Sequence, residues 1–209
     1  MSLKHEIANG LYEIEAVQIK PNDPFTWTSG IKSPIYCDNR LTLSYPAIRN
    51  KIAEAFVEMI EALDEKPDVI AGCATAGIPH AAWVADKLGL PMAYVRSKPK
   101  GHGKGNQIEG RITEGQKVVV IEDLISTGGS SIQAAKAVQE VGAEVLGVLA
   151  IFTYGLQKAT DQFATEEIAL HTITSFDILV SELEKVETIT SDEKVQLIAW
   201  RDQLFTSDK

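Results

Sequence analysis

The chain has 209 residues, of which 44% are hydrophobic, and a formal net charge of −9. This length supports one sizeable core, which we expect to span 1–209 as a single domain, and excludes two catalytic domains of ordinary size. The acidic balance argues against a nucleic-acid partner, because phosphate backbones are held mainly by lysine and arginine. A bound anion must therefore meet local positive charge.

The compartment is predicted from what the sequence lacks. No run reaches the roughly 18 apolar residues of a membrane span, and the N-terminal stretch has no apolar signal-peptide core. The two cysteines, Cys37 and Cys73, have no CxxC spacing and are typical of free thiols in a reducing compartment. We expect a cytoplasmic protein without a membrane partner.

The predicted elements alternate between helices and strands along the chain. An apolar stripe predicts a first core helix and is formed by Ile48, Ile52, Phe56, Met59 and Leu63. The stretch "DVIAGCATAGIPHAAWVADKLGLPMAYVR" then predicts a strand, a helix over 78–88 and a strand from Met92. The alternation repeats in "QKVVVIEDLI", in "SSIQAAKAVQEVGA" ended by Gly142, and in "EVLGVLAIFTY". This order predicts a parallel sheet covered on both faces.

Two helices are expected to close the chain. They are predicted in "SFDILVSELEKV" and "SDEKVQLIAWRDQLF". Each has a serine at its start, Ser175 in the first and Ser191 in the second, which we expect to act as its N-cap.

Two acids and an anion-binding loop follow the buried strand 118–121. Ligands of open parallel sheets bind beyond the carboxyl ends of the strands, where Glu122 and Asp123 stand. Residues 126–131 can turn backbone N–H groups toward one point at a helix start, and each bond to a charged group contributes about 1.5–3 kcal/mol. Neither a Walker A lysine nor a GxGxxG turn is present. The pattern favours a sugar phosphate, and the alternative is an ordinary turn with surface acids.

A basic stretch in this acidic chain is predicted to be a lid. Five basic residues crowd into nine positions without an acid: Arg96, Lys98, Lys100, His102 and Lys104. Three interspersed glycines would let the segment fold over a bound polyanion. The alternative is a solvated surface loop.

Three stretches carry a family resemblance. "VVVIEDLISTGGSS" is similar to the phosphoribosyl-pyrophosphate (PRPP) signature of the type I phosphoribosyltransferases. "FTWTSGIKSPIYCDNR" and "YVRSKPKGHGKGNQIEG" resemble the orotate-site segment and the mobile catalytic loop of orotate phosphoribosyltransferases. The resemblance covers nearly the whole chain. It implies the type I phosphoribosyltransferase fold, an α/β fold with a central parallel sheet flanked by helices and an N-terminal hood of about residues 1–45.

The resemblance also implies a reaction. Ribose 5-phosphate would pass from PRPP to N1 of orotate with inversion, giving orotidine 5′-monophosphate and pyrophosphate, a step of UMP biosynthesis. Mg²⁺ would be bound mainly through PRPP, so no metal-ligating residue is expected. The enzyme would be a homodimer with shared active sites.

Matching positions imply roles for individual residues. Glu122 and Asp123 would bind the ribose hydroxyls and help stabilise an oxocarbenium-like transition state. Arg96, Lys100 and His102 would reach the pyrophosphate in the neighbouring subunit's site, and Lys100 and His102 count with the two acids as catalytic. Ser126 would also touch orotate. The 5′-phosphate would be held by Leu124, Ile125, Ser126, Thr127, Gly128, Gly129 and Ser130.

The sequence departs from the family pattern where charge is expected. Some members have lysine in place of Thr28 and Ala76, and others have an arginine near Thr153 or Tyr154. Lys32 and Arg40 are the nearest candidates to bind the orotate carboxylate. Two other functions are possible alternatives. An adenine or xanthine phosphoribosyltransferase would keep the phosphate signature but would not need the segment "SGIKSPIYCDNR", and a PRPP-sensing regulator would need a nucleic-acid-binding surface or an added domain.

Overall fold

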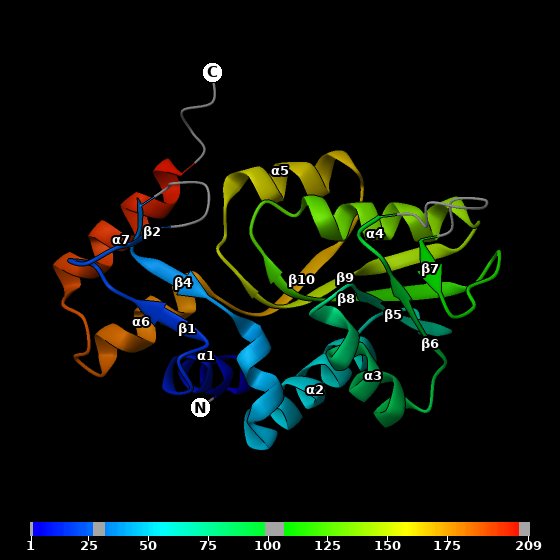
Figure 1. Cartoon of the computed structure of the whole chain (residues 1–209), viewed down its shortest axis with the longest axis horizontal. Helices are drawn as coiled ribbons and strands as arrows, with labels where there is room; N and C mark the ends of the chain where they lie inside the picture. Colours follow the sequence, from blue (N-terminus) through cyan, green and yellow to red (C-terminus); the bar gives the residue numbers. More distant parts are fainter. Residues whose placement is uncertain (1, 27–31, 99–106, 205–209) are drawn as a thin grey trace.

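The computed structural model describes residues 2–26, 32–98 and 107–204. A six-stranded sheet lies at the centre of this part of the chain, in the order β10-β9-β8-β5-β6-β7 (Figure 1). All neighbouring strands are parallel except the edge strand β7, which is antiparallel to β6. The strands are β5 (Val69–Cys73), β6 (Met92–Val95), β7 (Ile108–Glu109), β8 (Lys117–Ile125), β9 (Glu144–Thr153) and β10 (Leu170–Ser175). The predicted parallel sheet is confirmed.

Helices cover both faces of the sheet (Figure 1). The helices α1 (Leu3–Glu13), α2 (Pro46–Glu61) and α3 (Gly77–Leu88) lie on one face, and α4 (Gly129–Glu140) and α5 (Gln157–Thr165) lie on the other. Side chains alternate along each strand, so Ile70 packs in one core cluster and its neighbour Ala71 in the other. The near-continuous apolar strands follow from burial on both sides.

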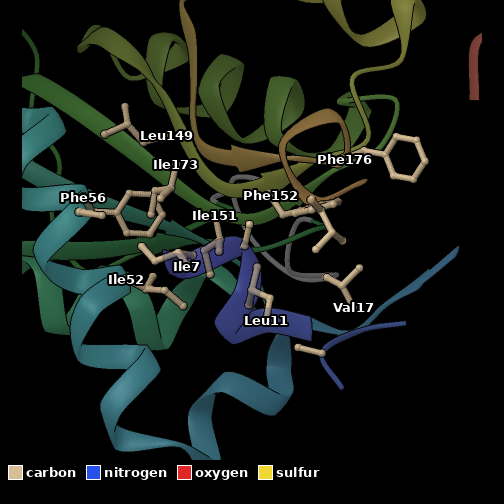
Figure 2. Packing of buried hydrophobic residues seen from close by; sticks show 14 of the residues in the cluster. Ile7, Leu11, Val17, Ile52, Phe56, Leu149, Ile151, Phe152, Ile173 and Phe176 are labelled. Carbon is tan, nitrogen blue, oxygen red and sulfur yellow. The ribbon is translucent and has the colours of Figure 1, made fainter. Parts of the chain in front are cut away.

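The core on the first face is built from distant parts of the chain. Figure 2 shows Ile7 and Leu11 of α1 beside Ile52 and Phe56 of α2 and Leu149 of β9. All five side chains are fully buried. Each contributes about 1.5–3 kcal/mol relative to exposure, which explains why Ile48, Ile52 and Phe56 of the predicted stripe face inward. Met59 and Leu63 are partly buried, and Leu63 lies beyond the end of α2.

Short strands and two further helices lie at one end of the sheet (Figure 1). Two small antiparallel pairs form there, β1 with β4 and β2 with β3. The four strands are β1 (Val17–Ile19), β2 (Phe25–Thr26), β3 (Lys32–Ser33) and β4 (Ile35–Cys37). The 3-10 helix η1 (Asn39–Ser44) follows β4, and the last two helices are α6 (Phe176–Lys185) and α7 (Ser191–Gln203). The predicted hood includes β1 to β4, and its boundary as a domain remains a prediction. In the described ranges, no helix combines the length and apolar character that crossing a membrane requires.

The two closing helices differ in their caps. Ser175 caps α6 as predicted, its Oγ accepting from the N–H of Ile178 at 3.3 Å. The prediction for α7 was wrong: Thr190 is the cap, and Ser191 is the first helical residue. Thr190 and Glu193 form a reciprocal capping box, with Oγ1 accepting from the Glu193 N–H at 3.2 Å. The glutamate three residues after Thr190 selects this register.

Candidate active site

A pocket of about 380 Å³ opens where strands β5 and β8 end. Four separate segments of the chain meet there: the start of η1, the turn after β5, the end of β8 and the first turn of α4. The lining residues are Cys37, Asp38, Arg40, Ala74, Thr75, Ala76, Glu122, Asp123, Leu124 and Ser130.

The sequence predicted that the two acids lie beyond the end of the strand. They lie inside it, because β8 extends to Ile125. The pairing of β8 with β9 continues to Ile125, whereas its pairing with β5 ends at Ile121. Glu122 and Asp123 therefore stand on a part of the strand that has lost one neighbour. The open side of the strand gives their carboxylates access to the pocket while the other side keeps the backbone in place.

Burial dominates the electrostatics of the acid pair. Glu122 is only 6% exposed, and burial, followed by the charge of Asp123, raises its pKa to about 8. Burial also raises the pKa of Asp123. The two acids together keep a proton to a higher pH than isolated carboxyls would. Such a pair is stabilised by a ligand that supplies hydroxyl donors.

The start of α4 is arranged to receive an anion. Gly128, the N-cap residue, has φ +84° and makes no side-chain cap bond to the helix. The first N–H groups of a helix have no intrahelical partner, and the helix dipole favours negative charge there. A Cβ at position 128 would lie 2.6 Å from the Phe163 ring, so close packing also requires glycine. Ser131 faces inward, and its Oγ donates to the carbonyl of Gly128.

Helix α3 places the turn of residues 74–76 against β8. Gly77 begins this helix, and a Cβ there would lie 2.3 Å from the carbonyl oxygen of Ile121. Only glycine permits this approach, which brings Ala76 to the same pocket as Glu122. The Ala74–Thr75 peptide bond in this turn is cis.

The basic segment begins at a closed hairpin base. Arg96 donates its N–H to the carbonyl of Gln107 at 2.8 Å, and Gln107 Nε2 donates back to the carbonyl of Arg96 at 3.0 Å. The Arg96 guanidinium lies 3.6 Å from a carboxylate oxygen of Glu109. Lys100 and His102 lie outside the described residues.

The two candidates for the orotate carboxylate lie in different pockets. Arg40 lines the pocket of the acid pair and makes a bidentate ion pair with Asp38, at 2.6 and 2.8 Å. This guanidinium, by hydrogen bonding, lowers the pKa of Asp38. Lys32 lines a separate groove with Trp200, and its Nζ donates to Thr26.

An arginine does stand near Tyr154, but it comes from α7. Arg201 Nη1 donates to the Tyr154 carbonyl at 3.1 Å and to Asp177 at 2.9 Å. The Arg201 side chain is 9% exposed. Its contacts attach α7 to the end of β9.

Asn39 is a site residue that the sequence analysis missed. Its Nδ2 donates to the carbonyl of Asp123 at 2.7 Å, and the residue is 1% exposed. An asparagine between Asp38 and Arg40 is easily taken for a turn residue. The sequence offers no signal for a contact between residues so far apart.

The chain is similar in sequence and in structure to proteins of one known family. Residues 43–179 match the family described as "Phosphoribosyl transferase domain". The chain is 61% identical to an orotate phosphoribosyltransferase of Oceanobacillus iheyensis, over 97% of this chain and 100% of that one. It is 59% identical to the corresponding protein of Enterococcus faecalis, over 94% and 93%. The structure is similar to that of orotate phosphoribosyltransferase from Aeropyrum pernix, with a TM-score of 0.74 and 28% identity over 88% and 99%. The chain belongs to the orotate phosphoribosyltransferases.

Proposed function

We propose that the pocket between β5 and β8 is the place where the family's reaction occurs, the transfer of ribose 5-phosphate from PRPP to orotate. The observation that carries this proposal is the pairing of a buried carboxylate, Glu122, and a half-buried one, Asp123, with an uncapped helix start. A sugar phosphate presents the complementary groups, vicinal hydroxyls at one end and a phosphate monoester at the other.

The phosphate end of PRPP is assigned to the β8–α4 turn. Backbone N–H groups and hydroxyls of residues 124–130 would hold the 5′-phosphate without a lysine. Ser130 lines the pocket beside Leu124, which supports this placement. Ser126 would also touch orotate, as its matching position in the family implies.

The acid pair is assigned to the ribose. Glu122 and Asp123 would accept hydrogen bonds from its hydroxyls and stabilise the positive charge that develops on the ring as pyrophosphate leaves. The low exposure of Glu122 and the partial burial of Asp123 strengthen both effects, since water competes less for the carboxylates. Orotate then attacks the anomeric carbon from the side opposite to pyrophosphate, which accounts for inversion.

A bound Mg²⁺ would neutralise part of the pyrophosphate charge. Within the described ranges, no group of three or more histidine, cysteine, aspartate or glutamate side chains gathers to hold a metal. The pocket offers the hard carboxylate oxygens of Glu122 and Asp123 beside the ribose position. These carboxylates would face the ribose hydroxyls, whereas the ion would be held by pyrophosphate and ribose oxygens and by water, so no metal-ligating side chain is required.

The orotate carboxylate is assigned to Arg40. This guanidinium lines the same pocket as Asp123, and its side chain is 64% exposed, so it can reach a ligand. Arginine binds carboxylates through two parallel hydrogen bonds, which is the geometry that it already makes with Asp38. Lys32 lines another groove and is a weaker candidate.

The lid is proposed to act across a two-fold homodimer. Arg96, Lys100 and His102 would neutralise the leaving pyrophosphate in the partner's pocket. Lys100→Ala and Asp123→Asn proteins, mixed, unfolded and refolded, test this arrangement. Random re-pairing makes about half the dimers hybrids with one intact site, so roughly a quarter of wild-type activity returns. With hybrids confirmed by mass, activity that stays at the level of the separate mutants contradicts sharing.

The reverse reaction tests the function itself. Purified protein with Mg²⁺ should consume orotidine 5′-monophosphate only when pyrophosphate is added, and should form orotate and PRPP. In the forward direction adenine and xanthine should not replace orotate. Turnover of a purine in place of orotate would contradict the proposal, and so would retained PRPP binding without any turnover.

A further inference from the structure

Asn39 joins the first residues of η1 to strand β8 through its side chain. Its Nδ2 donates to the carbonyl oxygen of Asp123 at 2.7 Å, and its Oδ1 lies 3.4 Å from Sγ of Cys37. The carbonyl oxygen can only accept a hydrogen bond, so the amide nitrogen must face Asp123. A buried side chain thus connects two segments 84 residues apart.

Asn39 is itself held firmly. The backbone carbonyl of Asn39 accepts a hydrogen bond from Oγ1 of Thr42 at 2.6 Å, and Thr42 is fully buried. The same hydroxyl lies 3.4 Å from Nε2 of His80 in helix α3. Because Thr42 of η1 contacts both the Asn39 backbone and His80 of α3, the Asn39 side-chain amide has little freedom to turn away from β8.

The contact reaches β8 where the strand has lost a neighbour. Pairing with β5 ends at Ile121, two residues before Asp123. Asn39 donates to the peptide that follows this point, and the same residue carries one of the two pocket acids. The orientation of a peptide unit determines where the attached side chain points. Asn39 therefore acts on the direction of the Asp123 carboxylate without lining the pocket.

We propose that Asn39 is a positioning residue, which fixes the Asp123 peptide so that the carboxylate faces the ribose while Arg40 stays at the base end. This inference rests on the function proposed above. Asn39 precedes Arg40 in the chain, and its side chain is hydrogen-bonded to Asp123. The Asn39 side-chain amide therefore sets the distance between Asp123 and Arg40, which both line the pocket.

A purely structural role would also make Asn39 important for folding, and the acid pair provides a way to separate the two. Burial raises the pKa of Asp123, and the backbone N–H groups of Asp123 and Leu124 act in the opposite direction by favouring the ionised carboxylate. The Leu124 N–H lies in the same peptide unit as the carbonyl that Asn39 holds, so if this peptide turns, the bond from Leu124 weakens and the pKa of the acid pair rises further. The ionisable groups that face Asp123 are Glu122 on β8, Cys73 on β5, Cys37, Asp38 and Arg40 around the start of η1, and Tyr154 after β9.

The test compares Asn39→Leu, which keeps the size but removes the donor, with Thr190→Ala, which removes a helix cap away from the pocket. For each protein, kcat and KM for PRPP and for orotate are measured from pH 5 to 10, per folded protein. We expect Asn39→Leu to lower kcat/KM for PRPP at least about tenfold and to move the acid limb of its pH profile upward. Thr190→Ala should leave the position of that limb unchanged.

Asn39→Ser serves if the leucine variant does not fold, because its short side chain cannot span the distance to Asp123. The same loss and the same upward shift are expected for it. Wild-type kcat/KM per folded protein with an unmoved acid limb, in whichever variant folds, would overturn the inference. In that case wild-type turnover of orotate leaves the proposed function intact, whereas wild-type protein that does not use orotate means that the proposed function itself has failed.

Discussion

The carboxylate of Glu122 accepts a hydrogen bond from the backbone N–H of its neighbour Asp123 at 3.0 Å. The two acids therefore form one unit, whose proton belongs to the pair. Its raised pKa has a cost for folding that depends on pH, because the unfolded chain ionises both acids at ordinary values.

The acid pair should make the free protein less stable as pH rises. The pKa of Glu122 is 4.5 in the unfolded reference and about 8 in the fold. Between these values the folded state holds a proton that the unfolded state has released, so the free energy of unfolding falls as pH increases. Urea unfolding of wild type and of Glu122→Gln from pH 5 to 8 checks this. The contribution should vanish in the glutamine variant, and equal pH slopes in the two proteins would contradict it.

Replacing Asp123 tests the charge that we propose faces the ribose. Asp123→Asn keeps the shape of the side chain and removes its ability to stabilise positive charge on the ring. We expect kcat to fall at least about tenfold, which corresponds to 1.4 kcal/mol of transition-state stabilisation. Steady-state kinetics with saturating PRPP measures this. Unchanged kinetics would remove Asp123 from the catalytic assignment.

Arg40→Met should weaken the binding of orotate more than the binding of PRPP. Loss of a charge-assisted bidentate contact is worth about 1.5–3 kcal/mol, which is roughly a tenfold to hundredfold rise in KM for orotate. Lys32→Met is the matched control, because Lys32 lines a different groove. Asp38→Asn provides a second control, since it removes the partner of Arg40 but keeps the guanidinium. If both Arg40→Met and Asp38→Asn raise KM equally, Arg40 acts through its ion pair and not on orotate.

Replacing the first glycine of α3 and the first glycine of α4 by alanine should change the stability of the protein differently. Gly77→Ala places a Cβ 2.3 Å from the Ile121 carbonyl oxygen, so we expect destabilisation by about 1–3 kcal/mol. Gly129→Ala meets no atom within 4 Å at the same position of α4, and should be neutral or stabilising by up to about 1 kcal/mol. Thermal or urea unfolding separates them. Similar losses in both would show that backbone freedom, and not space, sets the requirement at position 77.

The elements that the sequence predicted correctly are those with a strong local pattern. The β-branched run from Val118 to Ile121 indicated a buried strand, and the glycines and hydroxyl residues after Ile125 indicated a turn into a helix. Ser191 was assigned wrongly because two adjacent hydroxyl residues compete for the cap, and only the pairing of Thr190 with Glu193 settles the register. The match to the orotate phosphoribosyltransferases confirmed the family that three motifs had indicated.

Features that depend on distant contacts could not be predicted. No local pattern indicates that Asn39 bonds to Asp123 or that Arg201 reaches the Tyr154 carbonyl from α7. The pKa of Glu122 likewise depends on burial by several elements at once. Chemical roles could be suggested from residue types, whereas the contacts that orient those residues required the fold.

The reciprocal bonds between Arg96 and Gln107 make the stretch between them a replaceable module. With the two ends already joined, the sheet does not depend on how many residues intervene. Doubling the length of a closed flexible segment costs only about 0.6 kcal/mol of chain entropy. Segments of different length and composition can therefore be exchanged at this hairpin without loss of the fold. A designer could therefore vary the stretch between Arg96 and Gln107 by itself, because the bonds that close its two ends belong to the residues that would be kept.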